Sequence, residues 1–278
     1  MNELSGRVNI VVAHRLEAQP LIDFFELTPD DSPASLTIYK NDTGINLIMC
    51  GIGMQAASLA TADLGEYQSR TTESVAAWLN FGIAGHKTAA IGSGLVANRI
   101  TDQRSGKTVY PSMLLGTRAS SPVLTVEEPE VNYAKDLAYE MEAYGFWSAA
   151  SMIAGLDLIQ VYKLISDNPT NPAHEIDLAA ISELVSKHMG QVSQFIAELQ
   201  ALSAEYNGAH QLPSEYALLS DRFRLSVTQH LQLKRLCQRF RALDMENLLV
   251  EFANSMPSSG RHLLDAMESR LETQLQNK

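Results

Sequence analysis

Short apolar runs alternate with longer amphipathic segments along the first two hundred residues. Apolar runs bounded by glycines or polar turns predict strands at residues 8–13, 36–40, 45–50, 76–81, 93–100, 108–110, 113–115, 123–126 and 159–165. Apolar residues at helical spacing predict helices over residues 16–25, 54–68, 131–155 and 176–206. This alternation is typical of an α/β domain, in which helices flank a mixed central β-sheet and cover its buried strands.

The pattern changes after residue 206. Asn207-Gly208 ends the last long helical pattern, and Pro213-Ser214-Glu215 is typical of a helix start. Residues 213–278 contain no strand pattern and predict two or three helices, with a break at residues 257–260. We therefore divide the chain into an α/β domain, residues 1–206, and an all-helical C-terminal extension, residues 207–278.

The extension contains a basic amphipathic stretch. Its basic residues are Arg222, Arg224, Lys234, Arg235, Arg239 and Arg241. Apolar residues between them follow helical spacing, which favours one helix with a solvated basic face and a packed apolar stripe. Two alternatives stay open: a nucleic-acid or protein partner that binds the basic face, or closure of the helix over a pocket.

Composition narrows the class of protein. The chain has 278 residues, of which 45% are hydrophobic, enough for a sizeable core. A net charge of −11 opposes broad capture of nucleic acid or of an anionic membrane. The sequence has neither a membrane-length apolar run nor a signal-like N-terminus, so we expect a cytoplasmic protein with no membrane partner. Two cysteines and seven histidines without ligand spacing predict no disulfide and no metal.

Acidic residues stand near the ends of three predicted elements. Glu17 follows the first strand, Glu142 belongs to a Met-Glu pair after the strand-rich middle, and Asp167 ends the Ile-Ser-Asp run after the last strand. Two glycine motifs lie between them, Gly-x-Gly at 51–53 and Gly-x-Ala-Gly at 82–85. A single Gly-x-Gly marks only a turn. The order and spacing of the whole set are the specific signal.

In that order, across about residues 7–205, these motifs resemble the nucleoside phosphorylase/nucleosidase superfamily. The resemblance is strongest to methylthioadenosine/adenosylhomocysteine nucleosidase-like proteins. It implies the mixed α/β fold of that superfamily, a purine-type nucleoside as substrate, and hydrolysis of its N-ribosidic bond. It also implies catalysis without a cofactor, and a homo-oligomer with a dimer favoured.

The resemblance also implies roles for individual residues. Cleavage of a ribosidic bond needs a proton for the leaving base and stabilisation of an oxocarbenium-like sugar. Asp167 would be the general acid that protonates the purine at N7, and Glu17 would orient or activate the attacking water. Glu142 would accept hydrogen bonds from the ribose 2′- and 3′-hydroxyls, with Met141 against the sugar. The remaining substrate-binding positions would be Ile83, Ala84, Gly85, Lys163 and Ser166.

Each acid also has an ordinary structural interpretation. Asp167 would cap the turn that follows it, as aspartates commonly do. Glu140 and Glu142 would be solvated helix charges. Glu17 would stabilise the first turn of a helix through the helix dipole, by at most about 1 kcal/mol. The order of the motifs favours the catalytic interpretation.

Four positions depart from the pattern of the superfamily. Asn80 stands where bacterial hexameric phosphorylases carry an arginine, which favours water over phosphate as the nucleophile. Lys163 replaces the arginine usual in nucleosidases, so a compact ammonium group takes the place of a planar guanidinium group with forked donors. Ile83 replaces a serine or threonine, which suggests an altered substrate choice. His86 replaces a glycine, and we assign it no role.

The base pocket is expected within residues 117–133, with Ser121, Val123 and Thr125 along it. Aromatic residues at Tyr110, Tyr144, Phe146 and Trp147 are candidates for stacking on a purine, although aromatic residues at helical spacing usually belong to a core. Two other functions stay open. One is a phosphate-dependent purine nucleoside phosphorylase. The other is a non-catalytic nucleoside-binding or interaction protein on the same scaffold.

Overall fold

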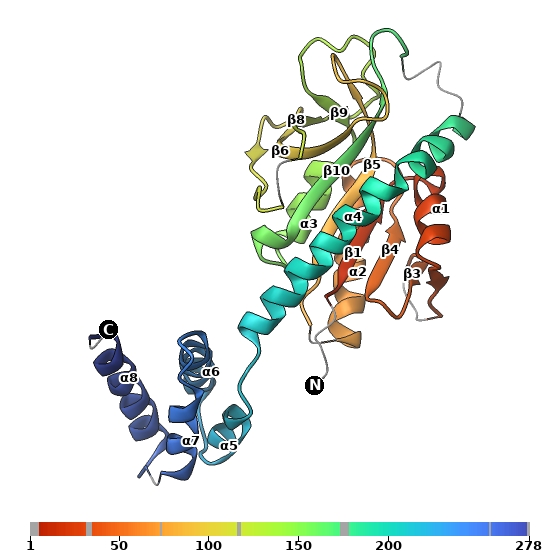
Figure 1. Ribbon diagram of the computed structural model, residues 1–278. Coiled ribbons are helices and arrows are strands. Elements are labelled where there is room, and N and C mark those ends of the chain that lie inside the picture. Colours follow the sequence, from red (N-terminus) through yellow and green to blue (C-terminus); the bar gives the residue numbers. More distant parts are fainter. Residues whose placement is uncertain are drawn as a thin grey trace. The chain divides into compact units, whose positions relative to one another are not determined.

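The computed structural model describes residues 6–31, 35–72, 74–115, 118–172, 178–255 and 257–276 (Figure 1). The chain divides into two compact units, residues 1–205 and residues 206–278. We describe each unit by itself.

The first unit is built on one ten-stranded mixed sheet. Its strands are β1 (Val8–Val12), β2 (Thr28–Pro29), β3 (Ile38–Lys40), β4 (Ile45–Met49), β5 (Ala77–His86), β6 (Gly94–Asp102), β7 (Thr108–Val109), β8 (Ser120–Thr125), β9 (Ala138–Glu140) and β10 (Ile159–Asp167). Its helices are α1 (Arg15–Phe24), α2 (Met54–Thr71), α3 (Ala143–Ala150), the short 3₁₀ helix η1 (Leu156–Leu158) and α4 (Leu178–His210), which runs past the division into the second unit.

The long strand β5 joins two parts of the sheet. Its first half, Ala77 to Phe81, pairs in parallel with β1, which also pairs in parallel with β4. Its last residues, Gly85 and His86, pair with β9 instead. The pairings of β5 with β10, β10 with β6, β6 with β8 and β8 with β9 close a ring of five strands. The pairing of β5 with β1 thus ends in the middle of β5, and the ring of five strands begins there.

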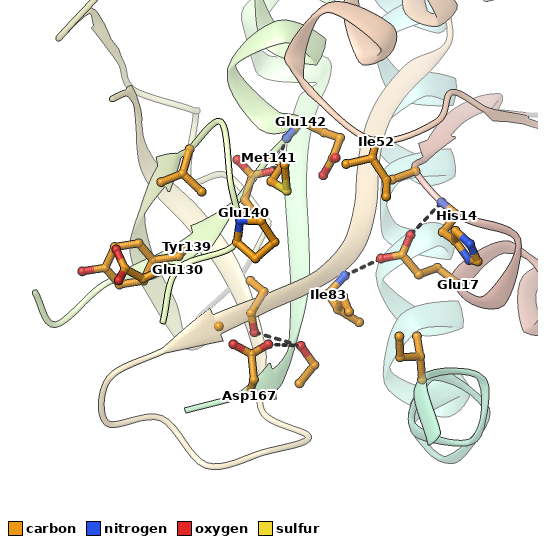
Figure 2. Close-up of a pocket in the computed structure, with 17 residues that line it drawn as sticks. His14, Glu17, Ile52, Ile83, Glu130, Tyr139, Glu140, Met141, Glu142 and Asp167 are labelled. Atoms are coloured by element: carbon orange, nitrogen blue, oxygen red, sulfur yellow. Dashed lines mark hydrogen bonds between the residues drawn. The ribbon is translucent and has the colours of Figure 1, made fainter. Parts of the chain in front are cut away.

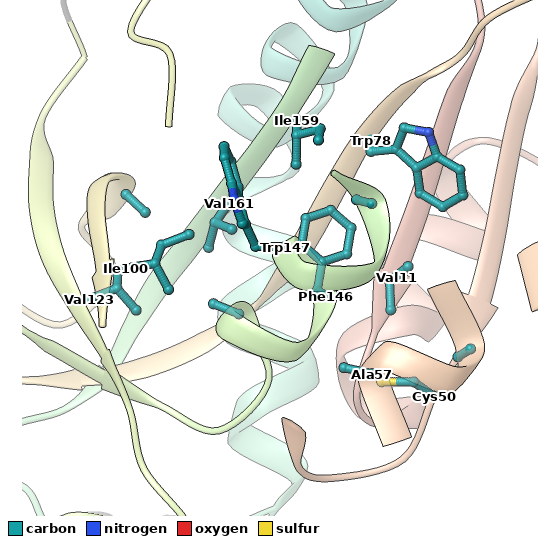
Figure 3. Close-up of a cluster of buried hydrophobic side chains, with 14 of the residues drawn as sticks. Val11, Cys50, Ala57, Trp78, Ile100, Val123, Phe146, Trp147, Ile159 and Val161 are labelled. Carbon is teal, nitrogen blue, oxygen red and sulfur yellow. The ribbon is translucent and has the colours of Figure 1, made fainter. Parts of the chain in front are cut away.

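Helices cover both faces of the sheet (Figure 1). On one face, Val11, Trp78 and Val161 pack with Phe146 and Trp147 of α3, and with α2, in the main core (Figure 3). On the other face, Tyr162 packs against Phe195 of α4, with their ring centroids 5.0 Å apart. Neighbouring residues of β10 thus point to opposite faces, as the pleat of a strand requires, and the predicted fold class is confirmed.

Two elements of the first unit differ from those predicted. The expected helix over 131–155 is wrong: the segment forms a turn, strand β9 and the shorter helix α3. Glu130 Oε1 accepts the amides of three successive residues, 131 to 133, and the last of them, Tyr133, has a φ of 45°. A helix does not accommodate that backbone. The expected strand at 113–115 is also wrong, because these residues pair with no strand.

The described residues of the second unit form four helices after α4, in place of the two or three predicted: α5 (Glu215–Asp221), α6 (Val227–Ala242), α7 (Glu246–Asn254) and α8 (Gly260–Gln276). A capping box of Ser226 and Gln229 starts α6, so Arg222 and Arg224 precede that helix instead of belonging to it. The apolar stripe of α6, including Leu233 and Phe240, packs in the core of the unit. No helix among the described residues has the length and apolar character needed to cross a membrane.

Candidate active site

A cavity of about 300 Å³ lies at the carboxyl ends of the parallel strands. This edge of an open α/β sheet is where such folds bind their ligands. Figure 2 shows Glu17, Glu142 and Asp167 around the cavity, each from a different part of the chain. Of the nine predicted site residues, eight line the cavity, and Lys163 is the exception. The structure thus brings together residues up to 150 positions apart.

Glu17 is held by backbone amides on both of its oxygens. It is the third residue of α1, where it forms a capping box with His14, and its Oε2 accepts the amide of His14 at 3.0 Å. Its Oε1 accepts the amide of Ile83 at 2.9 Å. Gly82 leaves room for this carboxylate, because a Cβ there would lie 2.9 Å from Oε1. The position thus serves the helix start and also aims a fixed carboxylate at the cavity.

Glu140 is the buried last residue of β9, close to the start of α3. Its Oε2 accepts the amides of Glu142 and Ala143 at 2.9 and 2.7 Å, and its Oε1 accepts the hydroxyl of Thr125 at 2.6 Å. Lys163 Nζ lies 3.0 Å from the same Oε2. This carboxylate is therefore satisfied on both oxygens, and it fixes the turn that carries Met141 and Glu142 into the cavity.

Glu142 reaches across to the glycine motif after β4. Its Oε1 accepts the amide of Gly53 at 2.8 Å, and its Oε2 lies 4.0 Å from Lys163 Nζ. Its side chain is buried, as is that of Glu140. The interpretation of these two glutamates as solvated helix charges is therefore wrong. Glu140 is the last residue of β9 and Glu142 is the N-cap residue of α3, and both lie inside the domain.

Three carboxylates share one buried ammonium group. Burial would lower the pKa of Lys163, but Glu140, Glu142 and Glu17 together outweigh it and raise that pKa. Burial also raises the pKa of Glu17, partly offset by Lys163. Burial likewise raises the pKa of Glu142 to about 7. Lys163 thus lies beneath the cavity lining as a counter-charge for the acids, and not as a group that faces the cavity.

Asp167 ends β10 at an irregularity of the strand. The pairing with β5 shifts between Ile165 and Asp167, which leaves Ser166 as an extra residue. Such bulges re-aim side chains near active sites. Asp167 Oδ1 accepts the Ser166 hydroxyl, and Oδ2 accepts the Tyr133 hydroxyl, both at 2.5 Å. The following turn is capped by Asn168, whose Oδ1 accepts two amides at 3.0 Å. The turn-capping role considered for Asp167 therefore belongs to Asn168.

Part of the segment 117–133, expected to form the base pocket, lines the cavity. Val126, Pro129 and Glu130 line it, whereas Ser121, Val123 and Thr125 do not. Tyr139, beyond that segment, also lines the cavity. Residue 117 lies outside the described residues. Tyr139 had no signal in the sequence, because its segment carried a helical pattern.

The aromatic candidates have other positions. Phe146 and Trp147 belong to the main core, Tyr144 packs against it, and Tyr110 is 71% exposed. His86 Nδ1 accepts the amides of Thr88 and Ala89, so its Nε2 carries the proton and donates to Ser121 Oγ at 3.2 Å. In that tautomer the imidazole cannot take a proton from the serine, and His86 supports the local backbone.

The electrostatic character of the cavity is acidic. Five carboxylate side chains line it, from Glu17, Glu130, Glu140, Glu142 and Asp167, while no lysine or arginine of the described chain does. Asn80 lies within the sheet, where its amide donates to the Val11 carbonyl at 3.2 Å. Over the same described residues, no cluster of three or more histidine, cysteine, aspartate or glutamate side chains is arranged to hold a metal ion.

Comparisons with known proteins place the fold. No model of a protein family matches the sequence, and neither does any curated protein. Solved structures do match. The 5′-methylthioadenosine/S-adenosylhomocysteine nucleosidase of Helicobacter pylori is 16% identical, with a TM-score of 0.55 over 69% of this chain and 99% of that chain.

Two further structures agree with it. The 5′-methylthioadenosine nucleosidase of Arabidopsis thaliana is 16% identical, with a TM-score of 0.57 over 69% of this chain and 96% of that chain. The futalosine hydrolase of Helicobacter pylori is also 16% identical, with a TM-score of 0.54 over 69% of this chain and 98% of that chain. These proteins belong to the nucleoside phosphorylase/nucleosidase superfamily, so the predicted resemblance is confirmed at the level of the fold.

Proposed function

We propose that this protein is a nucleosidase, a hydrolase that cleaves the N-ribosidic bond of a purine-type nucleoside. The observation that carries the proposal is the convergence of Glu17, Glu142 and Asp167 on one cavity of about 300 Å³. The fold adds support, since the similar solved structures are hydrolytic nucleosidases. Candidate substrates are 5′-methylthioadenosine, S-adenosylhomocysteine and related nucleosides.

The proposed reaction divides the work among the acids. Asp167 donates a proton to purine N7 as the bond from the base to C1′ breaks, so the bonding electrons leave with a neutral base. The sugar becomes oxocarbenium-like, and the surrounding carboxylates stabilise its positive charge. Glu17 takes a proton from a water molecule whose oxygen bonds to C1′. Glu142 accepts hydrogen bonds from the ribose hydroxyls, with Met141 beside the sugar.

The lining of the cavity favours water over phosphate as nucleophile. A phosphate needs basic side chains or a set of backbone amides to hold its charge. Five carboxylates line the cavity and would repel such an anion. The backbone amide of Ile83 donates to Glu17 Oε1 at 2.9 Å, so an isoleucine side chain at this position leaves that hydrogen bond in place.

The test is release of free base from a panel of nucleosides: 5′-methylthioadenosine, S-adenosylhomocysteine, inosine and futalosine, each with and without phosphate. We expect release without phosphate, reduced about 10²- to 10⁴-fold in Asp167→Asn because the proton donor is lost. Asp157→Asn is the matched control, since Asp157 is exposed and precedes the opposite end of the same strand. That variant should keep the wild-type rate.

Two other results would replace the proposal. Release that requires phosphate would make the protein a purine nucleoside phosphorylase. Binding of a nucleoside without release, equal in the wild type and in Asp167→Asn, would make it a non-catalytic binding or interaction protein.

We further propose a homo-oligomer, with a dimer favoured, and a cytoplasmic location. The oligomer rests on the superfamily resemblance, and the location rests on the sequence. A partner for the helical unit is a separate hypothesis. Two of its basic residues already bond within the unit, Arg222 to the carbonyls of Ala253 and Ser255, and Arg241 to Gln211. Sedimentation of the full chain tests the oligomer.

A further inference from the structure

A buried tyrosine contacts the proposed general acid from behind. The Tyr133 hydroxyl donates to Asp167 Oδ2 at 2.5 Å, and the tyrosine side chain is 1% exposed. Asp167 lines the cavity (Figure 2). Tyr133 does not line it. The tyrosine is therefore placed to act on the carboxyl group and not on a ligand.

The backbone at this tyrosine is held in an unfavourable conformation. A φ of 45° is rare for a bulky aromatic residue. It is maintained by Glu130, whose Oε1 accepts the amides of Val131, Asn132 and Tyr133 at 3.0, 2.6 and 3.2 Å. Conformations of this kind persist where the surroundings fix them, and they concentrate at functional sites.

Packing directs the tyrosine ring toward the acid. The ring meets Tyr139 edge to face, with centroids 6.1 Å apart and an angle of 86° between the planes. Gly85 also lies close to the ring, and a Cβ there would lie 2.7 Å from Tyr133 Cε1 and 2.2 Å from Asp167 Oδ2. Only glycine at position 85 lets the hydroxyl and the carboxyl meet without displacement.

We propose that Tyr133 is a positioning residue that fixes the rotation of the Asp167 carboxyl group, so that its proton addresses purine N7. This inference rests on the proposed function. The last torsion of an aspartate is broad, so one hydrogen bond leaves the carboxyl plane poorly defined. Ser166 holds Oδ1 and Tyr133 holds Oδ2, and together they define it. Both donated bonds strengthen as Asp167 gives up its proton and becomes charged.

The test compares two ligands of nearly the same shape. Adenine has an acceptor at N7, and 7-deazaadenine has a C–H group there. We expect wild-type protein to bind adenine at least about tenfold more tightly in calorimetry, the effect of one hydrogen bond in a buried site. Tyr133→Phe keeps the packed ring and removes only the hydroxyl. We expect its preference to fall below about threefold, because the carboxyl is no longer aimed at N7.

Tyr67→Phe is the matched control. The Tyr67 hydroxyl donates to Asp30 Oδ2 at 2.7 Å, and neither residue lines the cavity. This variant loses the same type of bond elsewhere in the domain and should keep the wild-type preference. Thermal unfolding of all three proteins confirms that each is folded. As a second readout, Tyr133→Phe should lower kcat of base release about tenfold with little change in KM.

The outcomes separate the two proposals. If the wild type prefers adenine and Tyr133→Phe keeps that preference and the wild-type kcat, the role of Tyr133 is overturned and the nucleosidase proposal stands. If the wild type itself does not distinguish the two bases, Asp167 does not address N7. The proposed mechanism then fails, and the inference about Tyr133 fails with it.

Discussion

Four acids that border the same cavity are held in two different ways, three of them by an ammonium group and the fourth by hydroxyl groups. Glu17, Glu140 and Glu142 surround the buried ammonium group of Lys163. Asp167 is held instead by the hydroxyls of Ser166 and Tyr133. An ammonium group compensates fixed negative charge, whereas hydroxyl donors orient a carboxyl group and add no charge. One side of the cavity is therefore arranged to compensate negative charge. The other side is arranged to orient the one carboxyl group that is proposed to donate a proton.

The variant expected to have the largest effect on stability is Lys163→Met. Removal of the ammonium group leaves buried carboxylates uncompensated, and breaking a buried pair in this way costs about 3–5 kcal/mol. We expect the free energy of unfolding in urea to fall by that amount at pH 8. The matched control is Lys187→Met. Lys187 is exposed and pairs with Glu183 at 2.7 Å on α4, so its loss should cost less than about 1 kcal/mol.

A small loss in the free energy of unfolding in both lysine variants would contradict the role of Lys163 as the counter-charge of the acids. In that case the three acids would not depend on Lys163, and the two sides of the cavity would not differ in the way described. Measurement at pH 8 keeps the test clear, because Glu142, whose pKa is raised to about 7, is then mostly ionised.

The second test uses pH. Burial raises the pKa of Glu142 from 4.5 to about 7, so between these values the folded state binds more protons than the unfolded state. The stability from this group is therefore present at low pH and is lost as pH rises toward 7, by an amount on the order of 3 kcal/mol. We expect Glu142→Gln to have a flatter profile from pH 5 to pH 8. Urea unfolding of both proteins across this range measures the difference.

Other titrating groups contribute to the profiles of both proteins, so the test rests on the difference between the two profiles. Burial also raises the pKa of Glu17, which therefore acts with the same sign as Glu142 in both proteins. Burial lowers the pKa of His86, which acts with the opposite sign, but it does so equally in both proteins. The pKa values of Asp102 and Glu198 are lowered, so they affect stability only at more acidic pH. Parallel profiles for the wild type and Glu142→Gln would show that Glu142 is ionised throughout and that the shared ammonium group suffices for all three acids.

The sequence predicted acids that line the cavity, but it did not predict the tyrosine that holds one of them. Glu17, Glu142 and Asp167 were found because they follow predictable elements in an order shared with a known superfamily. Tyr133 was not, because its segment carries apolar residues at helical spacing and its φ of 45° depends on an oxygen of Glu130. Strand β9 has only three residues and exists through its pairing with β5 and β8. Local pattern does not reveal structure that tertiary contacts impose.

The prediction for Lys163 shows a related limit. Lys163 was predicted as a substrate-binding residue, but a sequence does not tell whether a basic residue faces a cavity or lies beneath its lining. That distinction depends on the strand to which it belongs and on the three acids that burial brings to it. The closed ring of five strands, which places β9 and β10 on either side of β5, was likewise not visible in any single segment.

The smallest of the three tests compares two glycines of the same strand. A Cβ at Gly82 would lie 2.9 Å from Glu17 Oε1, and one at Gly85 would lie 2.2 Å from Asp167 Oδ2. We expect Gly85→Ala to cost about 2 kcal/mol of stability through overpacking, and Gly82→Ala about half of that. Gly190 in α4 has no atom within 4 Å of the added Cβ, so Gly190→Ala should stabilise the helix by about 0.5–1 kcal/mol. Urea unfolding measures all three variants.

Base release separates the two glycines further. In Gly85→Ala the added methyl group pushes the carboxyl of Asp167 away from the Tyr133 hydroxyl, so kcat should fall more than the loss of stability alone would suggest. In Gly82→Ala the methyl group meets a carboxylate tied to two amides and close to an ammonium group, and its effect should be milder. If Gly82→Ala were the more damaging variant, the aim of Asp167 would matter less than the position of Glu17, and the side arranged for charge would limit the reaction.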